Sequence, residues 1–171
     1  MADTADTDAT HILAKDHRTV EDLFEKYESA SGHKTKAKIA QAICRELKIH
    51  AQIEEEIFYP ALKGKIDDDL LKEAYVEHDG AKLLINQIAE GGPDEEFYDA
   101  KVTVLKEEIE HHVEEEEKER DNMFQQARAA DVDLHALGKQ LLARKKELME
   151  LADSDGLPPA RATTMDHGVI A

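Results

Sequence analysis

Two short stretches of the chain each carry a histidine and a glutamate one helical turn apart. The first is His50 to Pro60 (HAQIEEEIFYP), in which Glu54 lies one turn after His50; the second pairs His112 with Glu116. Residues at this spacing share one face of a helix. The first pair continues an apolar helical stripe of Ile39, Ile43, Leu47, Ile57 and Ala61. Because polar groups without partners are costly in a core, the pattern predicts a bound cation.

The same arrangement occurs twice along the chain. The interval from His17 to His78 (78 − 17 = 61) nearly equals the interval from His50 to His112 (112 − 50 = 62). Each copy therefore offers one histidine from a first helix and a His-x-x-x-Glu pair from a second. Two such αα-hairpins, packed as an antiparallel up-down four-helix bundle, would bring all six groups into one core layer. The candidate metal ligands are His17, His50, Glu54, His78, His112 and Glu116.

The donor types limit the metal. Imidazoles and carboxylates without thiolates favour iron, manganese or zinc over Cu(I) or an iron–sulfur cluster, and Cys44 is the only cysteine. Six protein groups exceed the needs of one tetrahedral zinc. They fit two metal ions with bridging glutamates, and two irons with an open coordination position would bind O₂, peroxide or nitric oxide.

His111 competes with His112 for the ligand position, because His111 and Glu115 have the same spacing. The apolar stripe favours His112, since it steps by four, three and four through Leu105, Ile109, His112 and Glu116. His111 instead follows Val104 and Glu108, which predicts a place at the boundary of the bundle, next to the ligands rather than among them.

Apolar residues recur at helical spacing in five segments, which predicts an all-α protein. The expected helices are residues 10–29, 34–62, 67–90, 94–129 and 134–151. We expect a flexible N-terminus (1–9), the four-helix bundle (10–129), a fifth, C-terminal helix (130–152) and a disordered tail (153–171). The tail contains Gly156 and Pro158-Pro159, and deleting Leu157 to Ala171 is expected to change the melting temperature little.

Charge and length narrow the possible partners. The chain has 171 residues and a formal net charge of −17, which disfavours nucleic acid and anionic membrane surfaces. No apolar run reaches transmembrane length, and Met1 to Thr10 lacks the apolar core of a secretory signal. We therefore expect a cytoplasmic protein with a small-molecule ligand. The leucines of the fifth helix allow either a monomer or a homodimer.

Four motifs together resemble the hemerythrin-like family, the HHE cation-binding domain. They are KDH at His17, HAQIEEEIFYP at His50, VEHD at His78 and HHVEEEE at residues 111–117. The resemblance covers about Thr10 to Ala129. It implies a four-helix bundle around a non-haem di-iron centre, with the six candidate residues as its ligands.

Two departures from the family pattern affect the function. Ala74 stands where oxygen-carrying members have a further histidine, one turn before His78. One iron would then keep an open position or take a substitute ligand, for which Tyr75, Tyr59 and Glu77 are candidates. This disfavours simple reversible O₂ carriage and favours peroxide or nitric oxide chemistry. The Phe-Tyr-Pro ending of the first motif also has no counterpart after Glu116, which concerns packing.

The leading hypothesis is a di-iron protein that binds or senses O₂ or a related small oxidant, H₂O₂ or NO. The alternatives are a catalase-like or peroxidase-like enzyme, an enzyme that handles nitric oxide, and a bundle that holds metal for structure. A ferritin-like iron oxidase would need two Glu-x-x-His motifs. The chain has only the one from Glu108 to His111.

Overall fold

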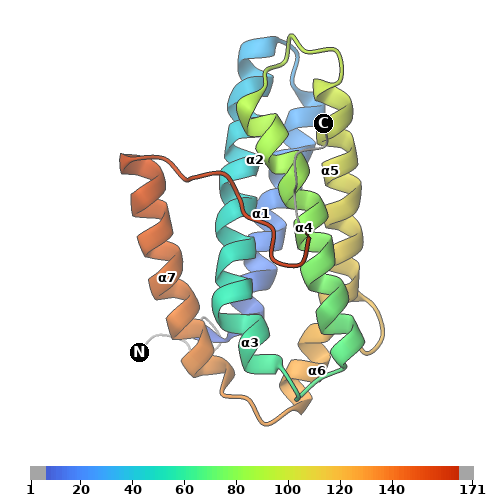
Figure 1. Cartoon of the computed structure of the whole chain (residues 1–171), viewed down its shortest axis with the longest axis vertical. Helices are drawn as coiled ribbons and strands as arrows, with labels where there is room; N and C mark the ends of the chain where they lie inside the picture. Colours follow the sequence, from blue (N-terminus) through green and yellow to red (C-terminus); the bar gives the residue numbers. More distant parts are fainter. Residues whose placement is uncertain (1–6, 166–171) are drawn as a thin grey trace.

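The computed structural model describes residues 7–165, and all regular secondary structure in this range is helical. Four long helices form an antiparallel bundle (Figure 1). They are α1 (Ala9–Ser29), α2 (His33–Ile53), α4 (Asp68–Glu90) and α5 (Tyr98–Val113). A further helix, α7 (Leu134–Ser154), packs against α1 and α2. The predicted all-α bundle with an additional C-terminal helix is confirmed.

Side-chain caps set the helix starts. The Asp8 carboxylate accepts a hydrogen bond from the Thr10 N–H at 2.8 Å, so the cap of α1 is Asp8 and not the expected Thr10. The Asp67 carboxylate likewise accepts from the N–H groups of Asp69 and Leu70. Each cap satisfies amide groups that have no partner within the helix. Of the N-terminus predicted to be flexible, residues 1–6 lie outside the described part, and Ala9 is already helical and buried.

The second and fourth bundle helices each continue into a π-helical turn. Turn η2 (Glu54–Phe58) joins α2 to the short helix α3 (Tyr59–Leu62), so the predicted helical segment from residue 34 to 62 is continuous. Turn η3 (Glu114–Lys118) extends α5 in the same way. Such turns widen the helix locally and are frequent at functional sites.

The predicted fourth helix, residues 94–129, is wrong at both ends. It begins at Tyr98 and ends with η3, because Glu119 is extended, and the chain then turns at Asp121, whose φ is +58°. Asn122 then starts a separate helix, α6 (Met123–Ala129), by accepting a hydrogen bond from the Gln125 N–H at 2.9 Å.

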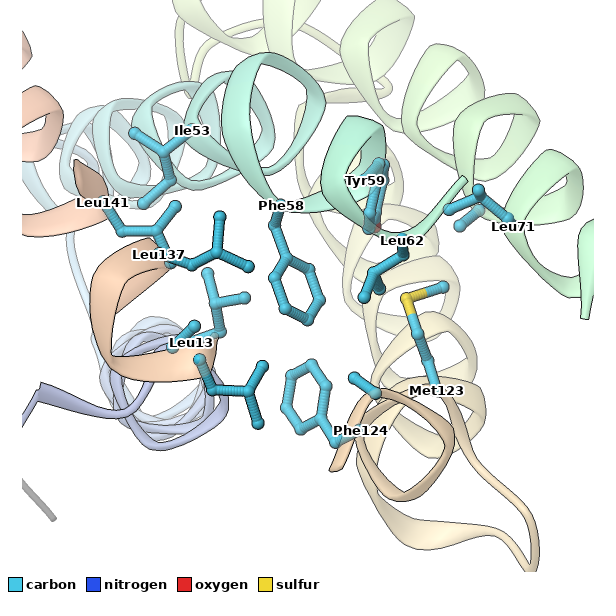
Figure 2. Close-up of a cluster of buried hydrophobic side chains, with 14 of the residues drawn as sticks. Leu13, Ile53, Phe58, Tyr59, Leu62, Leu71, Met123, Phe124, Leu137 and Leu141 are labelled. Atoms are coloured by element: carbon cyan, nitrogen blue, oxygen red, sulfur yellow. The ribbon is translucent and has the colours of Figure 1, made fainter. Parts of the chain in front are cut away.

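Two apolar clusters lie above and below the predicted ligand layer. One of them fills the end of the bundle and includes side chains of α3, α6 and α7 (Figure 2). Its large side chains include Leu13, Ile53, Phe58, Tyr59, Leu62, Leu71, Phe124, Leu137 and Leu141. The other contains Val20, Phe24, Ile43, Leu47, Ala81, Ile85 and Leu105. In α1, for example, His17 lies between Leu13 of the first cluster and Val20 of the second, so the polar layer is enclosed by apolar packing.

The prediction of a tail without fixed structure is wrong for the residues up to Met165. Helix α7 reaches Ser154, and the segment that follows crosses the bundle to α4 (Figure 1). There, Asp79 accepts hydrogen bonds from the backbone of residues 163–165. Deleting Leu157 to Ala171 would remove these contacts, so the expectation of an unchanged melting temperature has lost its basis. Residues 166–171 lie outside the described part.

Between residues 7 and 165, none of the helices combines the length and the apolar character that crossing a membrane requires.

Candidate metal centre

All six predicted ligand residues meet in one buried layer of the bundle. Each long helix contributes one histidine, and each π-helical turn contributes one glutamate. They are His17 from α1, His50 from α2, His78 from α4, His112 from α5, Glu54 from η2 and Glu116 from η3. None of the six is more than 6% exposed. That they bind metal stays a prediction, but their convergence supports it.

The four imidazoles form two pairs, and each pair comes from one hairpin. The Nε2 atoms of His17 and His50 lie 3.1 Å apart. Those of His78 and His112 lie 3.2 Å apart. Every Nε2 atom therefore points toward the middle of the layer, where a cation would be bound.

The two glutamates connect the histidine pairs. Glu54 places Oε1 3.0 Å from Nε2 of His50 and Oε2 3.1 Å from Nε2 of His78. Glu116 also connects the two pairs, with Oε2 3.3 Å from Nε2 of His17 and Oε1 3.1 Å from Nε2 of His112. Each carboxylate thus offers one oxygen to each pair, which is the arrangement expected of bridging ligands.

A second set of carboxylates faces the outer nitrogens of the histidines. The sequence interpretation missed this set, apart from Glu77, which it considered as a substitute metal ligand. The Nδ1 atoms of His50 and His112 lie 3.2 Å from Asp16 and 2.5 Å from Glu77. The Nδ1 atoms of His17 and His78 lie 2.8 Å from Glu117 and 3.6 Å from Glu55. Such partners fix the ring orientation of metal-binding histidines and raise their basicity.

The repeat contained a signal for these outer carboxylates. Asp16 and Glu77 directly precede the first-helix histidines, and their interval (77 − 16 = 61) is the one that separates those histidines. Glu55 and Glu117 directly follow the predicted ligand glutamates, at the interval of the second-helix residues (117 − 55 = 62). Extending the repeat by one position on each side would have identified all four.

Tyr59 is the substitute-ligand candidate that reaches the centre. Its hydroxyl donates to Glu116 Oε1 at 2.5 Å, and it lies 3.1 Å from Nε2 of His78 and 3.4 Å from Nε2 of His112. Tyr75 instead packs edge-on against the Tyr59 ring, with centroids 5.1 Å apart. The third candidate, Glu77, faces the outside of His112. The tyrosine hydroxyl therefore lies on the His78–His112 side of the layer and makes the two sides unequal.

His111 does not belong to the buried layer. Its side chain is 61% exposed, and its Nε2 lies 3.4 Å from Glu77 and 3.3 Å from Glu115. The side chain of His112 is 5% exposed. This arrangement agrees with the stripe that placed His112 inside and His111 at the boundary.

The charges of the layer depend strongly on one another. Burial alone would lower the pKa of His50, but Glu54 and Asp16 outweigh it and raise that pKa to about 10. Burial alone would raise the pKa of Glu116, but His112 and His17 hold it well below its usual range. Protons thus balance the carboxylates here, and a cation would displace them on binding.

Two buried carboxylate oxygens of the layer lack hydrogen bonds, and this bears on whether the residues suit a metal. Glu54 Oε1 and Glu116 Oε2 are buried and lie close to Nε2 of His50 and of His17, but neither oxygen has a hydrogen bond within residues 7–165. This is unusual for buried polar atoms. Donor atoms within 4.8 Å of one another form two buried groups, which are His17, His50, Glu54 and Glu116 in one, and Glu54, His78 and His112 in the other. Imidazole and carboxylate donors suit iron, manganese or zinc, so the residues fit a metal centre.

A small cavity of about 20 Å³ lies beside the four histidines. The rest of its lining is mostly apolar and includes Val20, Leu47, Ala81, Ile85, Ile109 and Val113. A cavity of this size holds about one water-sized molecule. The space next to the candidate metal centre therefore suits a ligand of very few atoms.

The chain is similar to known proteins in both sequence and fold. The sequence model of the hemerythrin HHE cation-binding domain matches residues 8–124. A hemerythrin HHE cation-binding domain-containing protein of Mycobacterium kansasii, known from its crystal structure, has the same fold. It superposes with a TM-score of 0.72 at 22% identity, and the match covers 88% of this chain and 94% of that one.

A curated relative is a DNA nickase of Nostoc sp. (strain PCC 7120), 26% identical over 116 residues. The match covers 68% of this chain but 33% of the nickase. The chain thus spans about a third of the length of this relative.

Proposed function

The chain belongs to the hemerythrin HHE cation-binding domain family, and we propose that it is a non-haem di-iron protein that binds or senses O₂, peroxide or nitric oxide. The observation that carries the proposal is the pair of carboxylates, Glu54 and Glu116, each with one oxygen toward each histidine pair. Two histidine pairs with two shared carboxylates supply a set of donors on each side of the layer, which supports two metal ions rather than one.

The proposed ligand assignment follows the two histidine pairs. One iron would be held by His17 and His50 and the other by His78 and His112, with Glu54 and Glu116 shared between them. The Tyr59 hydroxyl is the further donor on the His78–His112 side. Bound iron would supply a position for O₂ or a related oxidant, and the small cavity beside the histidines supports a ligand of that size.

The other residues of the site orient the ligands. Three carboxylates hold outer nitrogens of the histidines: Asp16 that of His50, Glu77 that of His112 and Glu117 that of His17. Glu55 faces the outer nitrogen of His78 at 3.6 Å. Burial excludes bulk water from the layer. Burial and the nearby carboxylates of Glu116 and Glu54 also raise the pKa of Tyr59 well above its usual value, so its hydroxyl stays protonated in the metal-free protein.

The second candidate is a catalase-like or peroxidase-like enzyme, or one that removes nitric oxide, at the same centre. The contact of 2.5 Å from the Tyr59 hydroxyl to Glu116 favours it, because it places a transferable proton beside the layer. A bundle that holds metal for structure is the remaining alternative. Binding of nucleic acid is disfavoured by the net charge of −17, so the activity of the Nostoc relative is not extended to this chain. A cytoplasmic location and a monomeric or homodimeric state stay predictions.

Metal analysis followed by spectroscopy tests the proposed function. We expect about two irons per chain in protein purified under reducing conditions, and a visible spectrum that changes on exposure to air or peroxide. Rapid loss of peroxide with evolution of gas would assign the enzyme. A spectrum that reverses on removal of oxygen would assign a carrier or sensor. Zinc in place of iron, with no redox response, would contradict the proposal.

The Tyr59→Phe variant is expected to keep the fold but to bind the iron on the His78–His112 side about tenfold less tightly. About tenfold is the lower end of the loss of affinity seen when a group that supports a metal site is removed. The ring packing survives in phenylalanine, and the variant loses only the hydroxyl directed at His78 and Glu116. Tyr75→Phe is the matched control, because Tyr75 contacts the ring of Tyr59 and not the layer. Titration with iron and the visible spectrum measure the difference. Identical affinities and spectra in Tyr59→Phe and wild type would exclude the tyrosine as a ligand.

A further inference from the structure

The segment that follows α7 is attached to the bundle through one buried carboxylate. We call residues 157–165 the C-terminal strap. Asp79 of α4 is fully buried. It accepts hydrogen bonds from the N–H groups of Thr163, Thr164 and Met165 at 2.6 to 2.8 Å, and from the Thr164 hydroxyl at 2.7 Å. Burial alone would raise the pKa of Asp79, but these bonds outweigh it and hold that pKa well below its usual range. The strap therefore supplies the donors that a buried carboxylate needs.

The contacts continue from Asp79 to a histidine of the metal layer. The Lys82 ammonium, which is buried, lies 3.3 Å from Asp79 and 2.6 Å from Glu55. Glu55 in turn faces Nδ1 of His78 at 3.6 Å, which is too long for a hydrogen bond, and this buried nitrogen has no hydrogen-bond partner within residues 7–165. The strap joins this series of contacts directly through Thr163, whose hydroxyl accepts from Lys82 at 3.3 Å and donates to Glu55 at 2.6 Å.

In the first half of the repeat, the carboxylate that faces the outer nitrogen of the histidine is held without a strap. Arg18 directly follows His17 as Asp79 directly follows His78, so the two residues correspond in the repeat. Arg18 pairs with Glu117, the carboxylate that faces Nδ1 of His17, and its side chain is 49% exposed. One exposed arginine thus holds the outer carboxylate of His17. On the His78 side, buried Asp79 and Lys82 replace it. Lys82 pairs with Glu55, and the strap donates hydrogen bonds to both Asp79 and Glu55.

The strap is attached to α4 at a second point, and a cavity lies between the strap and the bundle. Asn86 of α4 exchanges two hydrogen bonds with the backbone of Ala160, at 2.8 and 2.9 Å. Between the strap and the bundle is a cavity of about 470 Å³, with Glu55 and Lys82 in its lining. Figure 1 shows the strap crossing from the end of α7 toward α4. Leu157, at the start of the strap, packs against the first apolar cluster. The contacts that the strap makes with Asp79, Lys82 and Glu55 are polar.

We propose that the C-terminal strap is a positioning element for His78, acting through Thr163, Lys82 and Glu55. The proposal rests on metal binding at the centre, as proposed above. With the strap bound, Glu55 is kept facing Nδ1 of His78 as the nearest carboxylate, and Nε2 of the same ring is directed to the metal position. Binding of the strap and of the cation on the His78–His112 side then strengthen each other, as linkage requires.

Two chains shortened at the C-terminus test the proposal. A stop after Pro159 removes both anchors, whereas a stop after Met165 keeps every contact described above and is the matched control. Each protein is loaded with Fe(II) without oxygen, and the release of iron to a ferrous chelator is followed. We expect one of the two irons to leave at least about tenfold faster from the shorter chain, in line with the loss of a group that supports a metal ligand. The other iron, on the His17–His50 side, should leave at the wild-type rate.

A point substitution covers the case in which the shorter chain does not fold. Thr163→Val removes the hydroxyl between Lys82 and Glu55 but keeps the backbone bond to Asp79. We expect it to speed the release of the same iron by a smaller factor. Hydrogen exchange gives a readout that is independent of activity: the amides of residues 163–165 should exchange more slowly in iron-loaded than in metal-free full-length protein.

The outcomes separate this proposal from the proposed function. Equal release from wild type, Thr163→Val and the shorter chain, each carrying two irons, would overturn the role of the strap and leave the di-iron centre in place. Amide exchange in the strap that does not respond to iron would also overturn it. A full-length protein that binds no iron would overturn both.

Discussion

The Glu54→Gln variant is expected to lose both metal ions, while Glu56→Gln keeps them. Glu54 is fully buried and offers one oxygen to each histidine pair. The amide of glutamine keeps the size of the side chain but removes the charge and one of the two oxygens. We expect the affinity for iron to fall by more than about 100-fold at both positions, which exceeds the usual cost of losing an outer partner of a ligand.

Glu56 is a suitable control because it belongs to the same π-helical turn but points outward. Its side chain is 40% exposed and pairs with Arg144 at 2.8 Å. Iron per chain is measured on purified protein, and circular dichroism checks that both variants stay helical. Two irons per folded Glu54→Gln chain would remove Glu54 from the ligand set and, with it, the proposed sharing of carboxylates.

The second large effect is expected at the neighbouring residues His111 and His112. His112→Ala removes an imidazole whose two nitrogens face Glu77 and the centre of the layer. The iron on the His78–His112 side should therefore be lost, while the His17–His50 side keeps a complete set of its own histidines. His111→Ala removes a largely exposed side chain and should change iron content little.

The comparison of these two variants is sensitive to the register of α5. The residues are adjacent, so expression, helix propensity and net charge change in nearly the same way. Iron content and release rate distinguish them. Greater loss from His111→Ala than from His112→Ala would mean that the other face of α5 lines the core, and that the assignment of Glu116 also needs revision.

The repeat makes the two sides of the layer similar, and three features make them differ. Tyr59 directs its hydroxyl only to the His78–His112 side. The outer carboxylate of His78 is held by a buried lysine, whereas that of His17 is held by an exposed arginine. The strap contacts only the first of these carboxylates. The two proposed irons would therefore differ in coordination, which suits a centre where one position holds the oxidant.

The four bundle helices and the buried layer of histidines and glutamates could be predicted from the order of residues alone, although the ends of the fourth helix could not. The helical period puts His17 between Leu13 and Val20 on one face, and the same reasoning holds for the other three histidines. The nearly equal intervals between the two copies of the motif then show which residues correspond in the two hairpins. These are local properties of the chain, because the face that a side chain occupies on an amphipathic helix follows from its position in the stripe. The choice of His112 over His111 came from this reasoning alone.

Which atoms meet depends on how the helices pack. The contact from Glu54 to His78 joins different hairpins, and no spacing within one helix reveals it. Tyr59, Tyr75 and Glu77 were equal candidates in the sequence, and only the folded chain shows that the Tyr59 hydroxyl reaches the layer. The strap shows the same limit. Its sequence has no helical period to interpret, and its order comes from Asp79, a hydrogen-bond acceptor on a helix far away along the chain.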